Sequence, residues 1–403
     1  MTPDASGIVV AYCGHHQIYQ LALAAHELGE LNRFYCTLFD APGKWGGLAA
    51  RFFGASALIN RRCPEIPGAK VAENPWPQFA QSVCARVGLP SRWPATHDRF
   101  DRWVAHRLAA DQARVFVGVE TCARHSFEAA RRLGMKTLLE IPGVGTALLD
   151  RVSREAAADL GLPVPPPCDA PELVRSKERE LELADAVLVC SELQRRVFAG
   201  AGVPPDRIRV APLWVDCAFW QPPPGGLQPR SGRLKVIYAG RISFRKGIPY
   251  LLAAMEKAGA DCELTLVGPV EPDMAGFLSR CRGQFRLLAP QTKERLRALY
   301  WEHDALVLPS LGDSFGFVAM EAMACGLPVI VTDNCGVPVP DERWRAPVMD
   351  AGSIADRLRS WAADPERRVS DGRRAAAFAT SFTAARYRTE AKGAYSALLA
   401  QAA

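Results

Sequence analysis

Long apolar runs are missing from the chain, whose 403 residues hold no stretch near the roughly 20 consecutive apolar residues of a membrane-spanning helix. The N-terminus also lacks the positive charge that opens a signal peptide, because it begins Met1-Thr-Pro-Asp-Ala-Ser-Gly. Both absences argue against membrane insertion and secretion. We therefore expect a cytoplasmic protein.

Several cofactor and metal signatures are missing as well. Twelve cysteines are spread from Cys13 to Cys335, and no two have the C-x-x-C spacing of a redox or zinc site, so we expect reduced, buried thiols. No segment matches G-x-G-x-x-G, since Gly143-Val-Gly145 is followed by Leu148 at the third glycine position. A P-loop is absent too, and the dinucleotide-binding and NTPase interpretations therefore lose support.

The order of apolar segments indicates two α/β domains. Length alone favours more than one domain, and 49% hydrophobic with 23% charged residues is typical of globular chains. Short apolar runs at 8–13, 114–119, 136–141 and 186–190 alternate with segments of helical spacing, and the pattern restarts at 235–239. Such alternation predicts doubly wound parallel sheets with helices on both faces.

The most Pro- and Gly-rich segment, residues 221–232, separates the two patterns. We therefore predict one domain over residues 1–218 and a second over residues 219–383. Two helices are expected near the end of the chain, one over 353–362 with Ser353 as its N-cap and one over 384–403. We expect the last helix to pack back on the first domain.

The net charge is a mild +6, and part of the surplus lies between Arg51 and Arg107. This basic segment contains nine Arg or Lys residues against four acids, with Phe and Trp residues interleaved. Three interpretations stay open: an irregular solvated insertion, a surface for anionic lipid headgroups, and a nucleic-acid site. We expect no nucleic-acid partner.

A basic loop bounded by glycines opens the second pattern. Gly240-Arg-Ile-Ser-Phe-Arg-Lys-Gly247 stands between a predicted strand and a helix expected over 248–257. Glycine lets the backbone approach a ligand, and a helix N-terminus supplies free N–H groups and a positive dipole. Arg241, Arg245 and Lys246 add cationic charge. The loop predicts a phosphate site that needs no metal, with a solvated basic turn as the alternative.

Two acidic residues mark a second loop and helix near 309–330. Asp313 stands before a predicted helix over 317–325 and Glu321 lies eight positions later within it, so both carboxylates can face one cleft. The N–H groups of Phe315 and Gly316 lie at the helix N-terminus, where an anion or a sugar hydroxyl can bind. The alternatives are a turn or N-cap role for Asp313 and a dipole-favoured position for Glu321.

These motifs resemble the second domain of retaining glycosyltransferases of the GT-B fold, specifically family 4, also called glycosyltransferase group 1. The E-x7-E hallmark of that family stands here as Asp313-Ser-Phe-Gly-Phe-Val-Ala-Met-Glu321. Four further matches lie in order at 183–191, 202–216, 238–247 and 264–268. The resemblance implies two Rossmann-like domains facing across a cleft, the first for the acceptor and the second for a nucleotide sugar.

The resemblance also implies a role for each matching position. It implies a diphosphate site at Arg241, Lys246 and Gly14, a nucleoside site at Glu321, Leu287 and Leu288, and a donor-sugar site at Asp313, Phe315 and Gly316. The donor is expected to be UDP- or GDP-linked, and the acceptor to be a sugar or a lipid-linked compound. No Asp-x-Asp occurs in the chain, which fits transfer without a metal, and no cofactor is expected.

The first domain departs from the family pattern. Pro142 stands near the place of the family's active-site histidine, and Glu140 is the nearest polar substitute, either catalytic or simply ending a strand. His15 follows the first predicted strand, where it either contacts acceptor or sugar or packs on the turn as a neutral ring. We predict catalytic roles for Asp313, Glu140 and His15.

Three functions stay open from the sequence. The first is a retaining glycosyltransferase of polysaccharide or glycolipid assembly, in peripheral contact with the inner face of a membrane. The second is a GT-B-shaped sugar-nucleotide epimerase or phosphorylase. The third is a degenerate nucleotide-binding scaffold without turnover, suggested by Pro142 and by Asp313 in place of glutamate.

Overall fold

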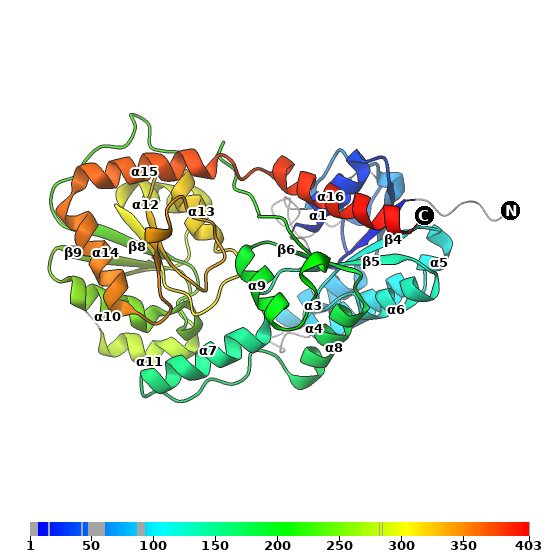
Figure 1. Ribbon diagram of the computed structural model, residues 1–403, viewed down its shortest axis with the longest axis horizontal. Coiled ribbons are helices and arrows are strands. Elements are labelled where there is room, and N and C mark those ends of the chain that lie inside the picture. The colour runs from blue at the N-terminus through cyan, green and yellow to red at the C-terminus, as the bar shows by residue number, and fades with distance from the viewer. Residues whose placement is uncertain are drawn as a thin grey trace.

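Two parallel β-sheets, each flanked by helices, form the core of the molecule (Figure 1). The computed structural model describes residues 7–14, 17–41, 43–46, 61–86, 93–281, 283 and 285–402. Within these residues, the first sheet has the order β3-β2-β1-β4-β5-β6-β7 and the second the order β10-β9-β8-β11-β12-β13. Neighbouring strands run parallel throughout both sheets, which confirms the doubly wound α/β prediction.

The strands come from two separate stretches of the chain. The first sheet contains β1 (Ile8–Ala11), β2 (Leu31–Cys36), β3 (Val71–Glu73), β4 (Val115–Val119), β5 (Lys136–Ile141), β6 (Ala186–Val189) and β7 (Ile208–Val210). The second sheet contains β8 (Leu234–Ala239), β9 (Cys262–Val267), β10 (Arg286–Leu288), β11 (Ala305–Leu308), β12 (Val329–Thr332) and β13 (Arg345–Ala346). Central strands such as β4 and β11 are buried at every position, because helices cover both faces.

Helices cover both sheets. Those of the first unit are α1 (Ile18–Glu27), α3 (Trp76–Arg86), α4 (Trp93–Ala105), α5 (Leu108–Asp111), α6 (Arg124–Arg132), α7 (Thr146–Asp159), α8 (Pro171–Leu183) and α9 (Glu192–Gly200). Later helices are α10 (Ile248–Ala258), α11 (Pro272–Arg280), α12 (Lys293–Glu302), α13 (Phe317–Ala324), α14 (Ala351–Ala363), α15 (Pro365–Ala379) and α16 (Ala384–Gln401). Among the described residues, every helix is too short or too polar to cross a membrane.

The start of α14 corrects one prediction. Asp350, not Ser353, is the N-cap, because its Oδ1 accepts a hydrogen bond from the Ser353 N–H at 2.9 Å. Its Oδ2 also accepts from the Ser353 hydroxyl at 2.6 Å. Both residue types are favoured N-caps, so composition alone does not choose between them.

The basic segment is a folded part of the first unit where it is described. β3, α3 and α4 lie within it, so the interpretation of an irregular solvated insertion is wrong for residues 61–86 and 93–107. Arg61 is only 6% exposed, and its Nη1 donates to Thr37 Oγ1 at 2.8 Å. Phe100 of α4 is fully buried. Arg61 therefore stabilises the fold and is not available to lipid headgroups, whereas Arg51 lies outside the described residues.

The last helix returns from the second unit to the first (Figure 1). α16 lies against α1, β5 and β6. The Tyr395 hydroxyl donates to the Leu21 carbonyl at 3.1 Å, and Arg388 and Lys392 pair with Glu27 at 2.8 and 2.7 Å. Residues at the two ends of the chain thereby stabilise the same side of the first sheet.

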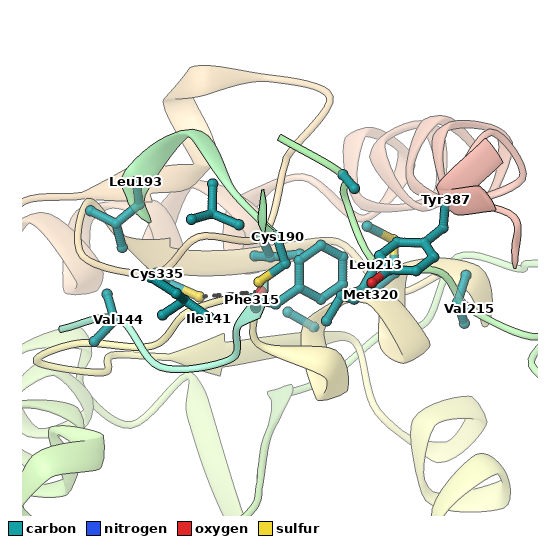
Figure 2. Close-up of a cluster of buried hydrophobic side chains, with 14 of the residues drawn as sticks. Ile141, Val144, Cys190, Leu193, Leu213, Val215, Phe315, Met320, Cys335 and Tyr387 are labelled. Carbon is teal, nitrogen blue, oxygen red and sulfur yellow. Dashed lines mark hydrogen bonds between the residues drawn. The ribbon is translucent and has the colours of Figure 1, made fainter. Parts of the chain in front are cut away.

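A buried apolar cluster joins the two units where their strands end (Figure 2). Its labelled members are Ile141, Val144, Cys190, Leu193, Leu213, Val215, Phe315, Met320, Cys335 and Tyr387. The Cys190 thiol also reaches the Ser314 carbonyl at 3.5 Å. The carboxyl ends of both sheets therefore meet around the loop that carries Asp313, which is where open α/β sheets place their ligands.

Candidate active site

Lys246 is held by a tight junction between a 3-10 turn, Phe244–Lys246, and α10. Gly247 has a φ of +71°, and a Cβ there would stand 1.9 Å from the Pro309 carbonyl oxygen, so only glycine fits. The Leu311 N–H donates to the Arg245 carbonyl oxygen at 3.0 Å. The basic loop therefore packs directly on the segment that leads from β11 to Asp313.

The Lys246 ammonium pairs with the Asp313 carboxylate. The two side chains are 29% and 15% exposed, so the pair is mostly shielded from solvent. Asp313 Oδ1 accepts hydrogen bonds from the N–H groups of Phe315 at 3.3 Å and Gly316 at 2.9 Å. One carboxylate thus joins the basic loop to the N-terminus of α13, and the structure brings these four predicted residues together.

The N–H groups expected to receive a donor sugar are satisfied by Asp313 itself in this structure. Backbone hydrogen bonds also hold the loop in place. The Asp313 N–H donates to the Asn334 carbonyl at 2.8 Å, and the Gly336 N–H donates to the Asp313 carbonyl at 2.9 Å. A sugar at this point must therefore bind through the carboxylate and Lys246 or move the carboxylate aside.

The two arginines of the loop lie apart from that pair. Arg241 has a side chain 73% exposed and pairs with Glu271 at 2.8 Å. Arg245 reaches across to the first unit, where its Nη1 lies 3.2 Å from the Cys168 sulfur. Both arginines are exposed, and Lys246 is the half-buried cation of the loop.

Glu321 lies one turn into α13, and no hydrogen bond to its carboxylate occurs among the described residues. Burial raises the pKa of Glu321 to about 7, against the opposing charge of Lys293. A carboxylate with such a pKa and no partner is ready to accept hydrogen bonds from a ligand's hydroxyl groups.

The leucines expected at the nucleotide base lie on β10, at the edge of the second sheet. Leu287 is 46% exposed, and Leu288 is partly buried. The Leu288 carbonyl accepts a hydrogen bond from Gly268 N–H at 3.0 Å, which ties this strand end to the strand end of β9. An exposed leucine beside a strand end offers an apolar surface for a flat ring.

The loop after β1 carries two of the first-domain predictions. Gly14 is partly buried, and a Cβ there would stand 2.3 Å from the Tyr12 ring, so a larger residue would displace that ring. His15 lies outside the described residues. Their roles at the diphosphate and in catalysis stay predictions.

Glu140 is on β5 and only 3% exposed. Its Oε1 accepts a hydrogen bond from the Gln17 amide. Burial raises the pKa of Glu140 to about 8; the Gln17 hydrogen bond opposes this effect and the charge of Glu120 adds to it. The group is therefore a neutral acid at pH 7, and its catalytic role stays a prediction.

Sequence reasoning missed two residues that position the site. Gln17 holds Glu140 from 123 positions away, and the Asn334 amide donates to the Leu311 carbonyl at 2.9 Å beside Asp313. Neither residue was assigned a role from the sequence, although each follows a strand of its sheet. Only the spatial neighbourhood of strand ends could have indicated them.

Residues 233–364, which carry Lys246, Asp313 and Glu321, match the family model described as "Glycosyl transferases group 1". The second domain belongs to this glycosyltransferase group 1 family. The matched residues include the basic loop, α13, Asp313 and Glu321, which are the features that carry the sequence resemblance.

Curated relatives support the same family. The chain is 31% identical over 193 residues to the D-inositol 3-phosphate glycosyltransferase of Pseudarthrobacter chlorophenolicus, covering 42% of this chain and 46% of the relative. It is 30% identical over 260 residues to that of Kineococcus radiotolerans, covering 53% and 58%. The alpha-maltose-1-phosphate synthase of Mycolicibacterium smegmatis is 29% identical over 219 residues, covering 46% and 56%. The chain spans about half the length of these relatives.

Solved structures show that the group 1 domain is part of a GT-B fold. Sucrose-phosphate synthase from Thermosynechococcus elongatus superposes with a TM-score of 0.66 at 19% identity, covering 98% of this chain and all (100%) of that chain. Anabaena HepE in complex with UDP gives a TM-score of 0.63 at 14% identity, covering 97% and 100%. Two facing Rossmann-like domains are therefore the architecture of this chain, as the resemblance implied.

Proposed function

We propose that the chain is a family 4 glycosyltransferase that moves a sugar from a nucleoside diphosphate sugar to a hydroxyl acceptor, with retention and without a metal. The observation that carries this proposal is the shielded Lys246–Asp313 pair at the N-terminus of α13, inside a group 1 domain. The acceptor class is a glycan or a lipid-linked sugar. The HepE structures with UDP and with UDP-glucose support a UDP-linked donor, and a GDP-linked donor is the alternative.

The arrangement suits departure of a diphosphate. Breaking the anomeric C–O bond develops negative charge on the leaving group, and groups already oriented toward that charge stabilise the transition state most. Lys246 is held by Asp313 and stands just before the N-terminus of α10, so its charge and the helix dipole act together. Arg241 lies on the same loop and adds a cation once it leaves Glu271.

Retention follows if the acceptor attacks from the face that the diphosphate leaves. The departing phosphate oxygen then accepts the acceptor's proton, so a pair of glycosidase-like carboxylates is not required. The anomeric configuration of the product, measured by NMR, tests this step. An inverted product would contradict the family 4 mechanism.

A screen of UDP-, GDP- and ADP-sugars by thermal shift identifies the donor, because a ligand at 100 times its Kd adds about 2.7 kcal/mol of stability. Transfer is then measured with the donor that the screen selects. We expect Lys246→Ala to weaken donor binding by roughly tenfold or more, since a hydrogen bond to a charged group contributes about 1.5–3 kcal/mol.

The matched control for that variant is Lys235→Ala. Lys235 lies on β8 of the same domain, and its side chain is 49% exposed with a distant partner, Glu263, at 4.0 Å. Donor affinity should be unchanged in this control. Equal donor affinities in Lys246→Ala and Lys235→Ala would show that Lys246 does not bind the diphosphate.

A nucleotide-binding scaffold without turnover is the second candidate. Two observations favour it: Asp313 already occupies the N–H groups of Phe315 and Gly316, and Glu140 is buried against Gln17. Tight binding of a nucleotide sugar with neither transfer nor hydrolysis of any donor would support this candidate. Turnover that Glu321→Ala abolishes would exclude it.

We also propose that the enzyme contacts anionic membrane from the cytoplasmic side during polysaccharide or glycolipid assembly. Arg62 and Arg99 are exposed in the basic segment, and Trp76 of α3 is 69% exposed. Sedimentation with anionic liposomes should fall when both arginines are replaced by glutamine. Absence of binding at low salt would contradict the membrane contact.

A further inference from the structure

Three potential metal ligands meet at the carboxyl end of the first sheet. Cys13 follows β1, Cys122 follows β4, and His97 is on α4, so three separate segments supply them. One ligand atom from each residue lies within 4.8 Å of the other two. In the part of the chain that the structure describes, no other group of three His, Cys, Asp or Glu side chains converges in this way.

The spacing of the two sulfur atoms suits a shared metal ion. The Cys13 and Cys122 sulfurs are 3.6 Å apart. Two thiolates on one tetrahedral zinc, each with a Zn–S bond of about 2.3 Å, stand about 3.8 Å apart. A disulfide would need about 2.05 Å. The thiols are also buried, at 3% and 2% exposure, which protects them from oxidation by dissolved agents.

The histidine is oriented as a metal-binding histidine should be. His97 Nδ1 lies 2.8 Å from the Thr121 hydroxyl, which leaves Nε2 available to a metal. The rings of Tyr12 and Trp93 pack edge-on against the imidazole, with centroids 5.7 and 5.1 Å away. These contacts fix the orientation of the imidazole ring.

Thr121 itself is held in a costly conformation. Its φ is +76°, which is unfavourable for a β-branched residue. Its N–H donates to Glu180 Oε2 at 2.6 Å, and Cys122 is the next residue. The strained turn therefore places the hydroxyl on His97 and the following thiol beside Cys13 at the same time.

Both thiols must lose their protons to bind the cation, because a thiolate is the form that binds metals. Two protons are therefore released when the cation binds to the fully protonated pair.

A cavity of about 550 Å³ lies beside two of the residues that contact His97. Thr121 and Trp93 form part of its wall, together with Asp98, Asp169 and Arg124. Asp98 and Asp169 are paired with neighbouring cations, so the cavity walls carry charges of both signs. Three protein ligands leave a fourth position of a tetrahedral zinc open, which water can fill.

We propose that Cys13, His97 and Cys122 bind one thiophilic divalent cation of the zinc class, through two thiolates and an imidazole. The ion ties the ends of β1 and β4 to α4. Cys13 directly precedes Gly14, so the ion also fixes the start of the loop predicted to face the donor. The site is independent of the proposed transferase function, because none of its ligands belongs to the group 1 domain.

The test measures metal in the protein as isolated and after dialysis against micromolar zinc under reducing conditions. We expect one zinc per chain by mass spectrometry of the elements, and at least tenfold weaker zinc binding in Cys122→Ser and His97→Gln. Cobalt added to the metal-free protein should give the near-ultraviolet absorption of thiolate–cobalt charge transfer. This signal is read in the unaltered chain, so it holds even if a variant fails to fold.

Cys36→Ser is the matched control, because Cys36 is fully buried on β2 of the same sheet and outside the cluster. It should retain full zinc content, with circular dichroism confirming that all three variants fold. Substoichiometric zinc without cobalt–thiolate absorption would overturn the proposal. So would equal zinc binding in Cys122→Ser and Cys36→Ser, or a Cys13–Cys122 disulfide in the isolated protein.

Discussion

Individual carboxylates in this molecule differ because of what surrounds them. Asp313 pairs with Lys246 and accepts hydrogen bonds from two backbone N–H groups. Glu140 is buried and Glu321 is half-buried, and neither has a cation in direct contact. Desolvation disfavours their charged forms. A carboxyl group therefore meets a cation at Asp313, whereas burial raises the pKa values of Glu321 and Glu140.

Glu321 should make donor binding depend on pH. Burial raises the pKa of Glu321 to about 7, so the group is a carboxylate at pH 8 and a carboxylic acid at pH 6. Only the carboxylate accepts hydrogen bonds from both hydroxyls of a ribose. We expect donor affinity, measured by calorimetry, to fall as the pH drops from 8 to 6, by at most about tenfold for each unit below the pKa.

Glu321→Gln is the control for that pH dependence, because its amide does not titrate. Its donor affinity should be lower at pH 8 and nearly flat across the range. A variant that keeps the wild-type pH profile would place the titrating group elsewhere.

Glu140 should make stability depend on pH. Burial raises its pKa from 4.5 to about 8, so between these values the unfolded chain ionises Glu140 while the folded chain keeps the proton. The stabilising contribution is complete below pH 4.5 and is lost as pH rises toward 8, at no more than about 1.4 kcal/mol per unit. The free energy of unfolding of Glu140→Gln, relative to that of wild type, should therefore increase between pH 4.5 and 8.

Urea unfolding at several pH values measures the effect. Glu180 and Glu321 also have raised pKa values, but they titrate in both proteins and cancel in the difference. A difference that does not change between pH 5 and 8 would mean that Glu140 is ionised in the folded protein.

At the scale of elements, the junction between the 3-10 turn and α10 decides where Lys246 points. Gly247→Ala adds a Cβ 1.9 Å from the Pro309 carbonyl oxygen at a φ of +71°. Gly134→Ala adds one at a similar φ, +75°, with no atom within 4 Å. We expect about 1 kcal/mol of destabilisation from strain in Gly134→Ala and a clearly larger loss in Gly247→Ala.

Donor binding distinguishes the two glycine variants further. Gly247→Ala should weaken it, because the turn must shift and Lys246 moves with it, while Gly134→Ala should leave it unchanged. Thermal unfolding and calorimetry on the same samples provide both measurements. Equal losses of stability in Gly247→Ala and Gly134→Ala would show that the segment around Pro309 moves to accommodate the added methyl group.

Elements differ in how well the sequence predicts them. The buried strand β5 matches its predicted bounds, because a run of apolar residues is enough to specify a strand covered on both faces. α7 and α15 were not predicted, since their many charged residues hide the apolar stripe. The burial of Arg61 was not predicted either, because its partner Thr37 lies 24 positions earlier in the chain, where no local pattern reveals the contact.

At the scale of the whole molecule, α16 stabilises the first unit from the far end of the chain. Two of its tyrosines are buried there, but only the Tyr395 hydroxyl has a partner, the Leu21 carbonyl at 3.1 Å. Among the described residues, the buried Tyr387 hydroxyl has none. Tyr387→Phe should therefore be neutral or stabilising, and Tyr395→Phe should lower the free energy of unfolding by about 1 kcal/mol.

Chemical denaturation of both variants measures this contrast. The aromatic packing of Tyr387 on Trp214, with ring centroids 5.1 Å apart, is kept in Tyr387→Phe. A loss of 1 kcal/mol or more in that variant would mean that its hydroxyl is hydrogen-bonded in solution.

The sequence by itself determined the α/β class, the two strand-and-helix patterns, and the basic loop and acidic pair of the second domain. These depend on local periodicity and on motifs whose members stand within about ten residues of one another. Only the tertiary structure decided that Asp313 joins Lys246 to α13, that Glu140 is a buried acid, and that three segments bring Cys13, His97 and Cys122 together. Long apolar runs and C-x-x-C spacings are missing, yet ligands from distant strand ends can still converge, because parallel strands place their carboxyl ends at one edge.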